Sequence, residues 1–151
     1  MQIDFTKFVA KMANAIHPDW FYEQSAVIPY RVSKGKIEVL LITTRKGRWI
    51  VPKGVIERDL SPAESAAKEA VEEAGVSGEV HERKIGRYSY EKWGSICRVE
   101  VYLLRVTKVH NAWEEDDFRI RKWLPIKDAI ATVSEPALKS MLKRVPERVR
   151  K

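Results

Sequence analysis

Apolar residues recur along this chain with two periods, and each period predicts a type of secondary structure. Alternation of apolar and polar residues, or a short run rich in Val and Ile, predicts strands at 25–32, 37–43, 49–51, 79–87, 88–93, 96–106 and 118–124. Spacing of three and four residues predicts helices at about 5–16, 61–75, 126–132 and 134–144. Strands interleaved with a few helices are typical of one layered α/β (α+β) domain, here residues 1–151.

Three segments of this pattern carry more specific expectations. Pro29 interrupts the first strand and indicates an edge strand or a bulge, because proline cannot donate to a β-ladder. Cys97 is the only cysteine, so no internal disulfide can form, and its place on a strand indicates a small buried hydrophobe. Residues from about 143 to 151 are mostly basic, and we expect a solvated tail there rather than a binding arm.

The helix expected at 61–75 has clear start and stop signals. Ser61 fits the N-cap, Pro62 fits the first helical position, and Glu64 can complete a capping box with Ser61. Gly75 stands where a helix C-terminus favours a residue in the left-handed conformation. An apolar stripe along the helix consists of Ala63, Ala67, Ala70, Val71 and Ala74. These features predict a short amphipathic helix.

Three carboxylates share one face of this helix. Glu69, Glu72 and Glu73 are spaced i, i+3 and i+4, and like charges at that spacing repel one another. A positive partner between them is therefore expected, and ligation by oxygen alone suits Mg²⁺ or Mn²⁺. The alternative is a solvated acidic face, but the helix cap and the PKG turn before the helix favour the metal.

The composition is that of a globular protein with an excess of positive charge. Hydrophobic residues make up 44% and charged residues 32% of the 151 residues, and the net charge is +7. No apolar run approaches the roughly 20 residues that span a bilayer, and the N-terminus lacks the apolar block of a signal peptide. We therefore expect a cytoplasmic protein that does not cross a membrane. The charge favours an anionic partner, which can be nucleic acid, a nucleotide or a polyphosphate.

The stretch from Gly54 to Val76 resembles the Nudix box. The family pattern is a glycine, five residues, a glutamate, seven residues, then Arg-Glu, an aliphatic residue, any residue, Glu-Glu, any residue, glycine and an aliphatic residue. This chain reads KEAVEEAGV at 68–76, and the spacing from Gly54 fits without a gap. Leu60 stands in place of the first glutamate, Lys68 in place of the arginine and Ala70 in place of a bulkier aliphatic residue.

Two flanking segments, TRKGRWIVPKG and WEEDDFRIRKWLPIKDAI, resemble the diphosphoinositol polyphosphate phosphohydrolase branch of this family and its bacterial relatives. The resemblance implies the Nudix fold, a mixed β-sheet sandwiched between helices, with the Nudix box at 54–76. It also implies a pyrophosphohydrolase that uses Mg²⁺ or Mn²⁺ to promote attack of water on a phosphorus. The implied substrate is a nucleoside diphosphate derivative, a dinucleoside polyphosphate or a diphosphoinositol polyphosphate, and we expect a monomer or a homodimer.

The resemblance also implies roles for individual glutamates. Metal binding and catalysis fall to the three glutamates of the helix, Glu69, Glu72 and Glu73. Glu57 either adds a metal ligand or is a solvated turn residue. The general base is either a glutamate of the box or a glutamate of the loop before the last strand, Glu114 or Glu115. The alternative for each loop glutamate is an acidic loop that only aids solubility.

Basic residues before the box are expected to contact substrate phosphates. Arginine suits phosphate because its planar donors can bind two oxygens at once. The expected substrate contacts are Arg45, Arg48, Lys53 and Gly54. The alternative for the basic residues is an ordinary basic hairpin loop.

The changes at 60 and 68 also support a second hypothesis, a Nudix-fold protein that binds nucleotide or RNA without turnover. A third hypothesis is an enzyme that removes pyrophosphate from RNA 5′ ends. The complete set of helix glutamates favours the small-molecule hydrolase.

Overall fold

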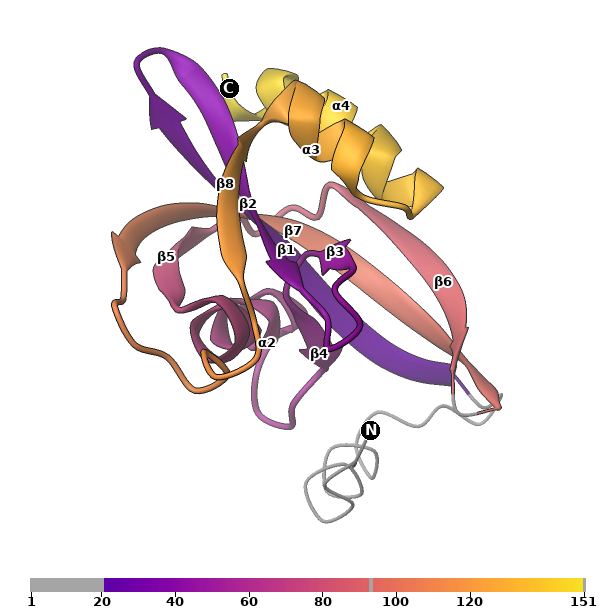
Figure 1. Cartoon of the computed structure of the whole chain (residues 1–151). Coiled ribbons are helices and arrows are strands. Elements are labelled where there is room, and N and C mark those ends of the chain that lie inside the picture. The colour runs from indigo at the N-terminus through magenta and orange to yellow at the C-terminus, as the bar shows by residue number, and fades with distance from the viewer. Residues whose placement is uncertain (1–20, 93, 151) are drawn as a thin grey trace.

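A mixed β-sheet lies at the centre of the fold, and helices cover both of its faces (Figure 1). The computed structural model describes residues 21–92 and 94–150, and the helix expected at about 5–16 lies outside them. The strands are β1 (Phe21–Ser33), β2 (Lys36–Thr43), β3 (Trp49–Ile50), β4 (Lys53–Val55), β5 (Val76–Val80), β6 (Gly86–Lys92), β7 (Ser95–Val109) and β8 (Arg121–Pro125). The helices are α2 (Pro62–Glu69), the π-helix η1 (Ala70–Ala74), α3 (Ile126–Thr132) and α4 (Pro136–Val149).

The central strand of the sheet is β1. It pairs in parallel with β7 from Phe21 to Tyr30, and on its other side it pairs antiparallel with β4 and then with β2. Further out, β3 and β8 pair with β2, whereas β5 and β6 pair with β7. This mixed sheet between helices confirms the expected α/β (α+β) fold class. The predicted strands are present, except that the stretch 79–87 contains the end of β5 and the start of β6.

Pro29 lies within this central strand, so the expectation of an edge strand or a bulge was wrong. The neighbour of β1 changes along one side, because β4 pairs as far as Ala26 and β2 pairs from Tyr30 onward. On that side the Val27 amide donates to the Pro52 carbonyl at 3.1 Å. Strand amides alternate in direction, so the position two residues further on faces the same side. Pro29, which has no amide hydrogen to donate, therefore lies at a point where neither β4 nor β2 pairs with β1.

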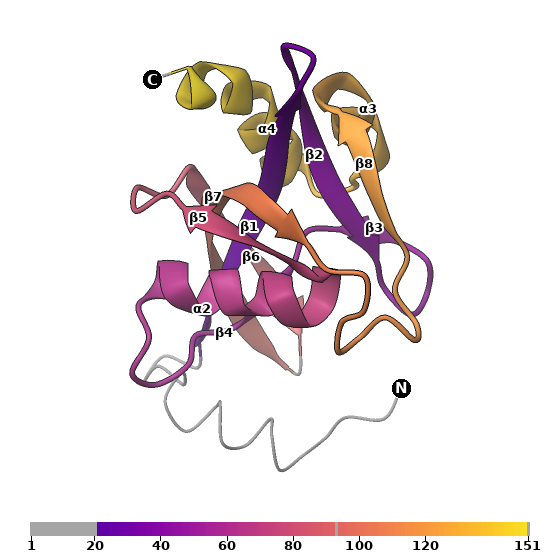
Figure 2. The same ribbon diagram turned by 90° about the vertical axis from the view of Figure 1, so that its left-hand side faces the viewer.

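Two hydrophobic cores lie on the two faces of the sheet, between the strands and the helices that Figure 2 shows on either side of them. On one face, side chains of β1, β2 and β7 pack against α3 and α4, whose Leu142 and Val145 are fully buried. On the other face, alternate side chains of the same strands pack against the helix that α2 and η1 form. That helix contributes Ala63, Ala66, Ala70 and Ala74. Cys97 is buried on β7 as a small side chain, as expected.

The basic C-terminal segment is largely helical rather than a free tail, although Lys143, Arg144 and Arg150 are exposed to solvent. α4 continues to Val149 although Pro146 lies inside it, because Val145 and Val149 complete its apolar face. Arg148 Nη2 donates to the main-chain carbonyl of Arg83 at 2.8 Å, which ties this end of α4 to the loop between β5 and β6. None of the helices in the described ranges combines the length and the apolar character that a membrane span needs.

Candidate active site

The start of α2 is built as the sequence predicts. Ser61 is the N-cap, and its side chain accepts a hydrogen bond from the Glu64 amide at 3.1 Å. In return, Glu64 Oε1 accepts from the Ser61 amide at 2.9 Å. Pro62 lies at the first helical positions. This capping box defines where the helix begins and therefore which of its side chains face the sheet.

The second half of the helix widens into the π-helix η1, which the sequence pattern did not indicate. Gly75 ends it in the left-handed conformation, with φ 65°, as expected. Successive side chains rotate less in a π turn than in an α turn, so residues after 69 depart from the faces of a regular α-helix. Val71, which was expected in the apolar stripe, is 40% exposed, whereas Ala74 is fully buried.

Glu69 and Glu73 form a buried carboxylate pair. The two residues are 3% and 8% exposed, and their carboxyl groups are close enough to share a hydrogen bond. Burial, followed by the adjacent Glu69 carboxylate, raises the pKa of Glu73 well above its usual value, and the Arg119 guanidinium opposes this shift. A buried pair of like charges destabilises the folded state, so this pair marks a place where a proton or a cation is held.

Gly54 makes room for the Glu69 carboxylate. A Cβ atom at residue 54 would lie 2.2 Å from Glu69 Oε1 and 2.4 Å from Glu69 Cδ. Gly54 belongs to β4 and pairs with Ser25 of β1. The adjacent Lys53 amide donates to Glu73 Oε1 at 3.2 Å. The segment expected as a turn is thus a short strand whose backbone lies against both buried carboxylates.

The loop between β7 and β8 is attached to the C-terminal end of the same helix. Trp113 Nε1 donates to the Glu73 carbonyl at 3.0 Å, and the Glu115 amide donates to the Glu72 carbonyl at 3.1 Å. The Arg121 guanidinium donates to main-chain carbonyls of both the helix end and the loop, at 2.6 to 3.2 Å. These bonds hold the loop, and Glu115 with it, beside the carboxylate pair.

Arg119 links the loop to the buried pair. Its Nε donates to Glu115 Oε1 at 2.9 Å, its Nη1 donates to the Thr43 carbonyl at 2.8 Å, and its Nη2 lies 3.8 Å from Glu73 Oε1. Glu115 lines the cleft over the pair, whereas Glu114 is exposed and does not line it. Arg119 was not expected at this site, although its position four residues after Glu115 is a signal that could have paired the two.

Glu57 and Glu72 are grouped around Lys68 instead. Lys68 Nζ lies 2.9 Å from Glu57 Oε1 and 4.0 Å from Glu72 Oε1. Glu57 Oε2 is buried and has no hydrogen-bond partner among the described residues. Neither Glu57 nor Glu72 lines the cleft. Of the three helix glutamates expected on one face, the structure therefore brings Glu69 and Glu73 to the cleft.

A cleft of about 340 Å³ opens over the carboxylate pair. Its basic lining residues are Arg45, Lys53, Lys92 and Arg119. The Arg45 guanidinium lies 3.8 Å from the centroid of the Phe118 ring. Burial lowers the pKa of Lys53, and the Glu73 carboxylate opposes this shift. Arg48, which was also expected to contact phosphate, does not line this cleft. It lines a neighbouring pocket that shares Lys53 and Tyr90 with the cleft.

The carboxylate pair fits a hard divalent cation. Across residues 21–92 and 94–150, no three His, Cys, Asp or Glu side chains are grouped so that they could hold a metal ion. Mg²⁺, however, is usually bound by one or two carboxylates together with water and substrate phosphates. Two adjacent buried carboxylates that face a cleft with basic walls meet this requirement, and the cation would relieve the repulsion between them.

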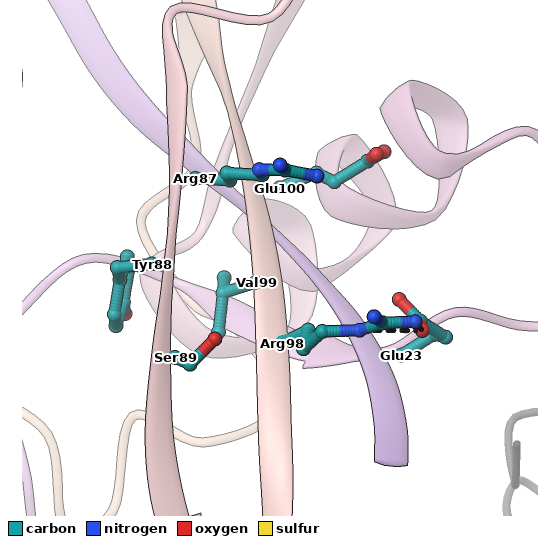
Figure 3. A pocket seen from close by; sticks show the side chains of 7 residues that line it. All are labelled: Glu23, Arg87, Tyr88, Ser89, Arg98, Val99 and Glu100. Carbon is teal, nitrogen blue, oxygen red and sulfur yellow. Dashed lines mark hydrogen bonds and ion pairs between the residues drawn. The ribbon is translucent and has the colours of Figure 1, made fainter. Parts of the chain in front are cut away.

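A second hollow lies over β6, β7 and the start of β1 (Figure 3). It has a volume of about 420 Å³, and charged side chains dominate its lining. Three of these charged side chains have partners, because Arg98 forms an ion pair with Glu23 and Glu100 accepts from Lys84 at 2.9 Å. The lining of this hollow contains no adjacent buried carboxylates. We therefore place the candidate active site in the cleft over the carboxylate pair of the helix.

Comparison with known proteins identifies the family of this chain. The family model of the NUDIX domain matches residues 22–145. Nudix hydrolase 21, chloroplastic, of Arabidopsis thaliana is 39% identical over 110 residues, which cover 68% of this chain and 55% of the relative. Diphosphoinositol polyphosphate phosphohydrolase 2 of Rattus norvegicus is 34% identical over 130 residues, which cover 82% of this chain and 69% of the relative.

The fold is also similar to that of solved structures. A crystal structure of a C. elegans Ap4A hydrolase binary complex matches with a TM-score of 0.72 and 24% sequence identity, over 85% of this chain and 97% of the other. This likeness is one of fold. The chain spans just over half the length of the Arabidopsis relative, 55%.

Proposed function

Because the chain belongs to the Nudix hydrolase family, we propose that it is a pyrophosphohydrolase that uses Mg²⁺ or Mn²⁺. Nudix hydrolases generally use divalent metal ions. The proposed substrate contains a diphosphate linkage, as in a nucleoside diphosphate derivative, a dinucleoside polyphosphate or a diphosphoinositol polyphosphate. The observation that carries the proposal is the buried Glu69 and Glu73 pair beneath a cleft with basic walls. The pair suits a cation, and the walls suit the phosphates that accompany it.

The side chains of the cleft have separate tasks in this reaction. Glu69 and Glu73 would hold the divalent ion, which supplies charge neutralisation and a more acidic bound water when it is present. Arg45 and Lys53 would orient the phosphate chain through charge-assisted hydrogen bonds. The absence of a side chain at Gly54 leaves room for the Glu69 carboxylate. We keep Glu57 and Glu72 as proposed supporting ligands because both belong to the stretch that resembles the Nudix box, although their carboxylates lie against Lys68 and neither lines the cleft.

Glu115 is the proposed general base. Its side chain lines the cleft and is 24% exposed, so it can exchange a proton with solvent after the reaction. It would take a proton from the attacking water as the water oxygen bonds to phosphorus and the anhydride P–O bond breaks. The leaving phosphate departs with the bonding electron pair. Arg119 contacts both Glu115 and Glu73, and its positive charge would stabilise the negative charge that develops between them.

Hydrolysis of a panel of diphosphate compounds tests the proposal. The assay compares Mg²⁺, Mn²⁺ and EDTA, and measures phosphate or nucleotide release. We expect metal-dependent release that falls by about 100-fold in Glu73→Gln, which loses a metal ligand, and in Glu115→Gln, which loses the base. Glu82→Gln changes an exposed glutamate outside the cleft and should retain wild-type turnover. Release by the wild type that does not exceed release by Glu73→Gln would refute the proposal.

The alternative is a Nudix-fold protein that binds nucleotide or RNA without turnover. The observation in its favour is Lys68, whose ammonium already contacts Glu57 and Glu72. This alternative predicts calorimetric binding that EDTA leaves unchanged, with no release of phosphate. Metal-dependent turnover excludes it. Removal of pyrophosphate from RNA 5′ ends is a separate candidate, and triphosphorylated RNA in the same panel tests it.

We further propose a cytoplasmic protein that acts as a monomer or homodimer on a phosphorylated small molecule, with nucleic acid as the less favoured partner. The net charge of +7 is compatible with either anion. Sedimentation of the purified chain measures its oligomeric state.

A further inference from the structure

A pocket with three arginines lies between the end of α4 and the loop that joins β5 to β6. It has a volume of about 550 Å³. Its lining consists of His81, Glu82, Arg83, Arg144, Glu147 and Arg148, and it is called the arginine pocket below. None of these residues lines the cleft over the carboxylate pair or the neighbouring pocket that contains Arg48.

The arginine pocket is separate from the candidate active site. The neighbouring pocket of the cleft reaches Glu135 at the start of α4, whereas Arg144 and Arg148 belong to the other end of that helix. The helix rises about 20 Å from Glu135 to Arg148. A small ligand in the arginine pocket therefore does not touch Glu69 or Glu73, and binding at the two sites can be measured separately.

Two arginines of α4 reach the loop between β5 and β6. Arg148 Nη2 donates to the Arg83 carbonyl at 2.8 Å, and Arg148 Nη1 donates to the Lys84 carbonyl at 3.3 Å. Arg144 lies one turn earlier, and its Nη2 would be 3.1 Å from a Cβ atom built at Gly86. The bonds of Arg148 use two of its guanidinium N–H groups and leave others for a ligand.

The positive charges of the arginine pocket are close together and are not paired. Burial, followed by the Arg83 and Arg144 guanidinium groups, lowers the pKa of Arg148. Within the ranges that the structure describes, no ion pair joins any of these three arginines to a carboxylate. Like charges that are held together repel one another, so the pocket favours an anion between them.

A single phosphate group suits the arginine pocket better than a nucleic acid does. Its charge of about −1.5 to −2 and its terminal oxygens match several guanidinium groups at once. Glu82 and Glu147 also line the pocket. A nucleic-acid backbone carries a phosphate at each nucleotide, so it would bring further phosphates against these two carboxylates. A compact oxyanion between the arginines avoids that repulsion.

We infer that the arginine pocket binds a phosphate group, either as inorganic phosphate or as the phosphate of a small monoester. Arg144 and Arg148 donate to its oxygens from α4, and Arg83 donates from the loop. The anion thereby adds a second link between the helix end and the loop, which the Arg148 hydrogen bonds already join. The inference goes beyond the proposed function, because no residue of this pocket takes part in the proposed hydrolysis.

An NMR titration of the isotope-labelled full chain in EDTA at constant ionic strength tests the inference. The two probes are inorganic phosphate and glycerol phosphate, which is a small monoester. We expect saturable shifts at the backbone amides of the arginine pocket, from which a Kd follows for each probe. A lower Kd for glycerol phosphate identifies a monoester as the ligand, and a lower Kd for inorganic phosphate identifies the free ion.

Variants of exposed residues separate a built site from general attraction to a basic surface. Arg144→Gln and Arg83→Gln each remove one guanidinium group, so each should raise the Kd for the tighter probe about tenfold. Lys143→Gln removes the same charge from the residue next to Arg144, which is exposed and does not line the pocket. This control should bind both probes as the wild type does.

Several results would overturn the inference. One is the absence of saturable shifts at the amides of the arginine pocket, or shifts that occur only at the cleft. Equal weakening in Arg144→Gln and Lys143→Gln is another, because the phosphate would then respond to net charge alone. Binding of a single-stranded oligonucleotide where neither small probe binds would instead show a nucleic-acid surface. Loss of metal-dependent hydrolysis refutes only the proposed function, so the two failures are distinguishable.

Discussion

Gly54→Ala is the substitution that probes the carboxylate pair most directly. The new Cβ would lie 2.2 Å from Glu69 Oε1, 2.4 Å from its Cδ and 3.0 Å from its Cγ. Gly54 is not among the described glycines with positive φ, so the backbone accepts alanine without strain. The whole effect of the substitution therefore falls on the position of the Glu69 side chain.

The structure sets the size of this effect. Real Cβ atoms essentially never approach another heavy atom within 3.0 Å, so the Glu69 carboxylate must move away. The shift is roughly 1 Å, and a misplacement of about 1 Å at a catalytic group can lower activity about 100-fold. The end of the Glu69 side chain can rotate, so overpacking should lower the free energy of unfolding by only about 1–3 kcal/mol. We therefore expect a large loss of activity with a modest loss of stability.

The assay measures kcat/KM with Mg²⁺, Mn²⁺ affinity, and the free energy of unfolding in urea. Gly86→Ala is a matched control, because its Cβ would meet Met141 Cε at 3.0 Å and Arg144 Nη2 at 3.1 Å, outside the cleft. This control should lose a similar amount of stability and keep its activity. If Gly54→Ala keeps kcat/KM within about threefold of the wild type, the argument that Gly54 positions Glu69 is wrong.

Three further predictions concern the support of the site. Arg121→Lys replaces a fork that reaches three main-chain carbonyls with a single ammonium, so urea unfolding should show a loss of about 1–3 kcal/mol; a change below about 0.5 kcal/mol would contradict this role. Ser61→Ala removes the capping box and should lower the free energy of unfolding by about 1 kcal/mol, and thermal melts that match the wild type would argue against the cap. Burial raises the pKa of Glu73, so the folded state binds this proton more tightly than the unfolded state; the resulting stability is present at low pH and lost as pH rises through the folded pKa. In EDTA, the free energy of unfolding of the wild type minus that of Glu73→Gln should therefore decrease between about pH 5 and about pH 8. A difference that increases over this range would show that the sign is wrong, and Mg²⁺ should restore stability at the higher pH in the wild type alone.

Features that depend on local sequence could be predicted. The N-terminus of α2 depends on Ser61 and Glu64, which are three residues apart, and its end depends on Gly75 alone. The strands follow from alternation over a few residues, as at β2 and β7. The approach of Glu69 and Glu73 could be predicted as well, because both lie on one helix.

Features that depend on distant residues could not be predicted. Pro29 is acceptable in a central strand because it lies between the part of β1 that pairs with β4 and the part that pairs with β2. No property of the residues near 29 encodes that arrangement. Arg121 and Trp113 bind carbonyls of the helix from more than thirty residues away. Tyr88 and Arg48 line one pocket although they are far apart in the sequence. Contacts between distant segments, such as those of Arg121 and Trp113, are therefore less predictable than the carboxylates of a single helix.

The contacts of Lys68 change the expected effect of having lysine in place of the Nudix-box arginine. From the sequence, lysine in place of arginine loses the bidentate fork that would orient the neighbouring glutamates. In the structure, Lys68 Nζ lies 2.9 Å from Glu57 Oε1 and 4.0 Å from Glu72 Oε1, so its charge opposes those of two carboxylates that do not line the cleft. A divalent ion that recruits Glu72 must compete with this ammonium, whereas an ion on Glu69 and Glu73 need not. If Glu72 is a metal ligand, Lys68→Gln removes the competing charge and should bind Mn²⁺ more tightly than the wild type does. Equal Mn²⁺ affinity of the wild type and Lys68→Gln would show that Glu72 is not a ligand and that the buried Glu69 and Glu73 pair binds the ion without it.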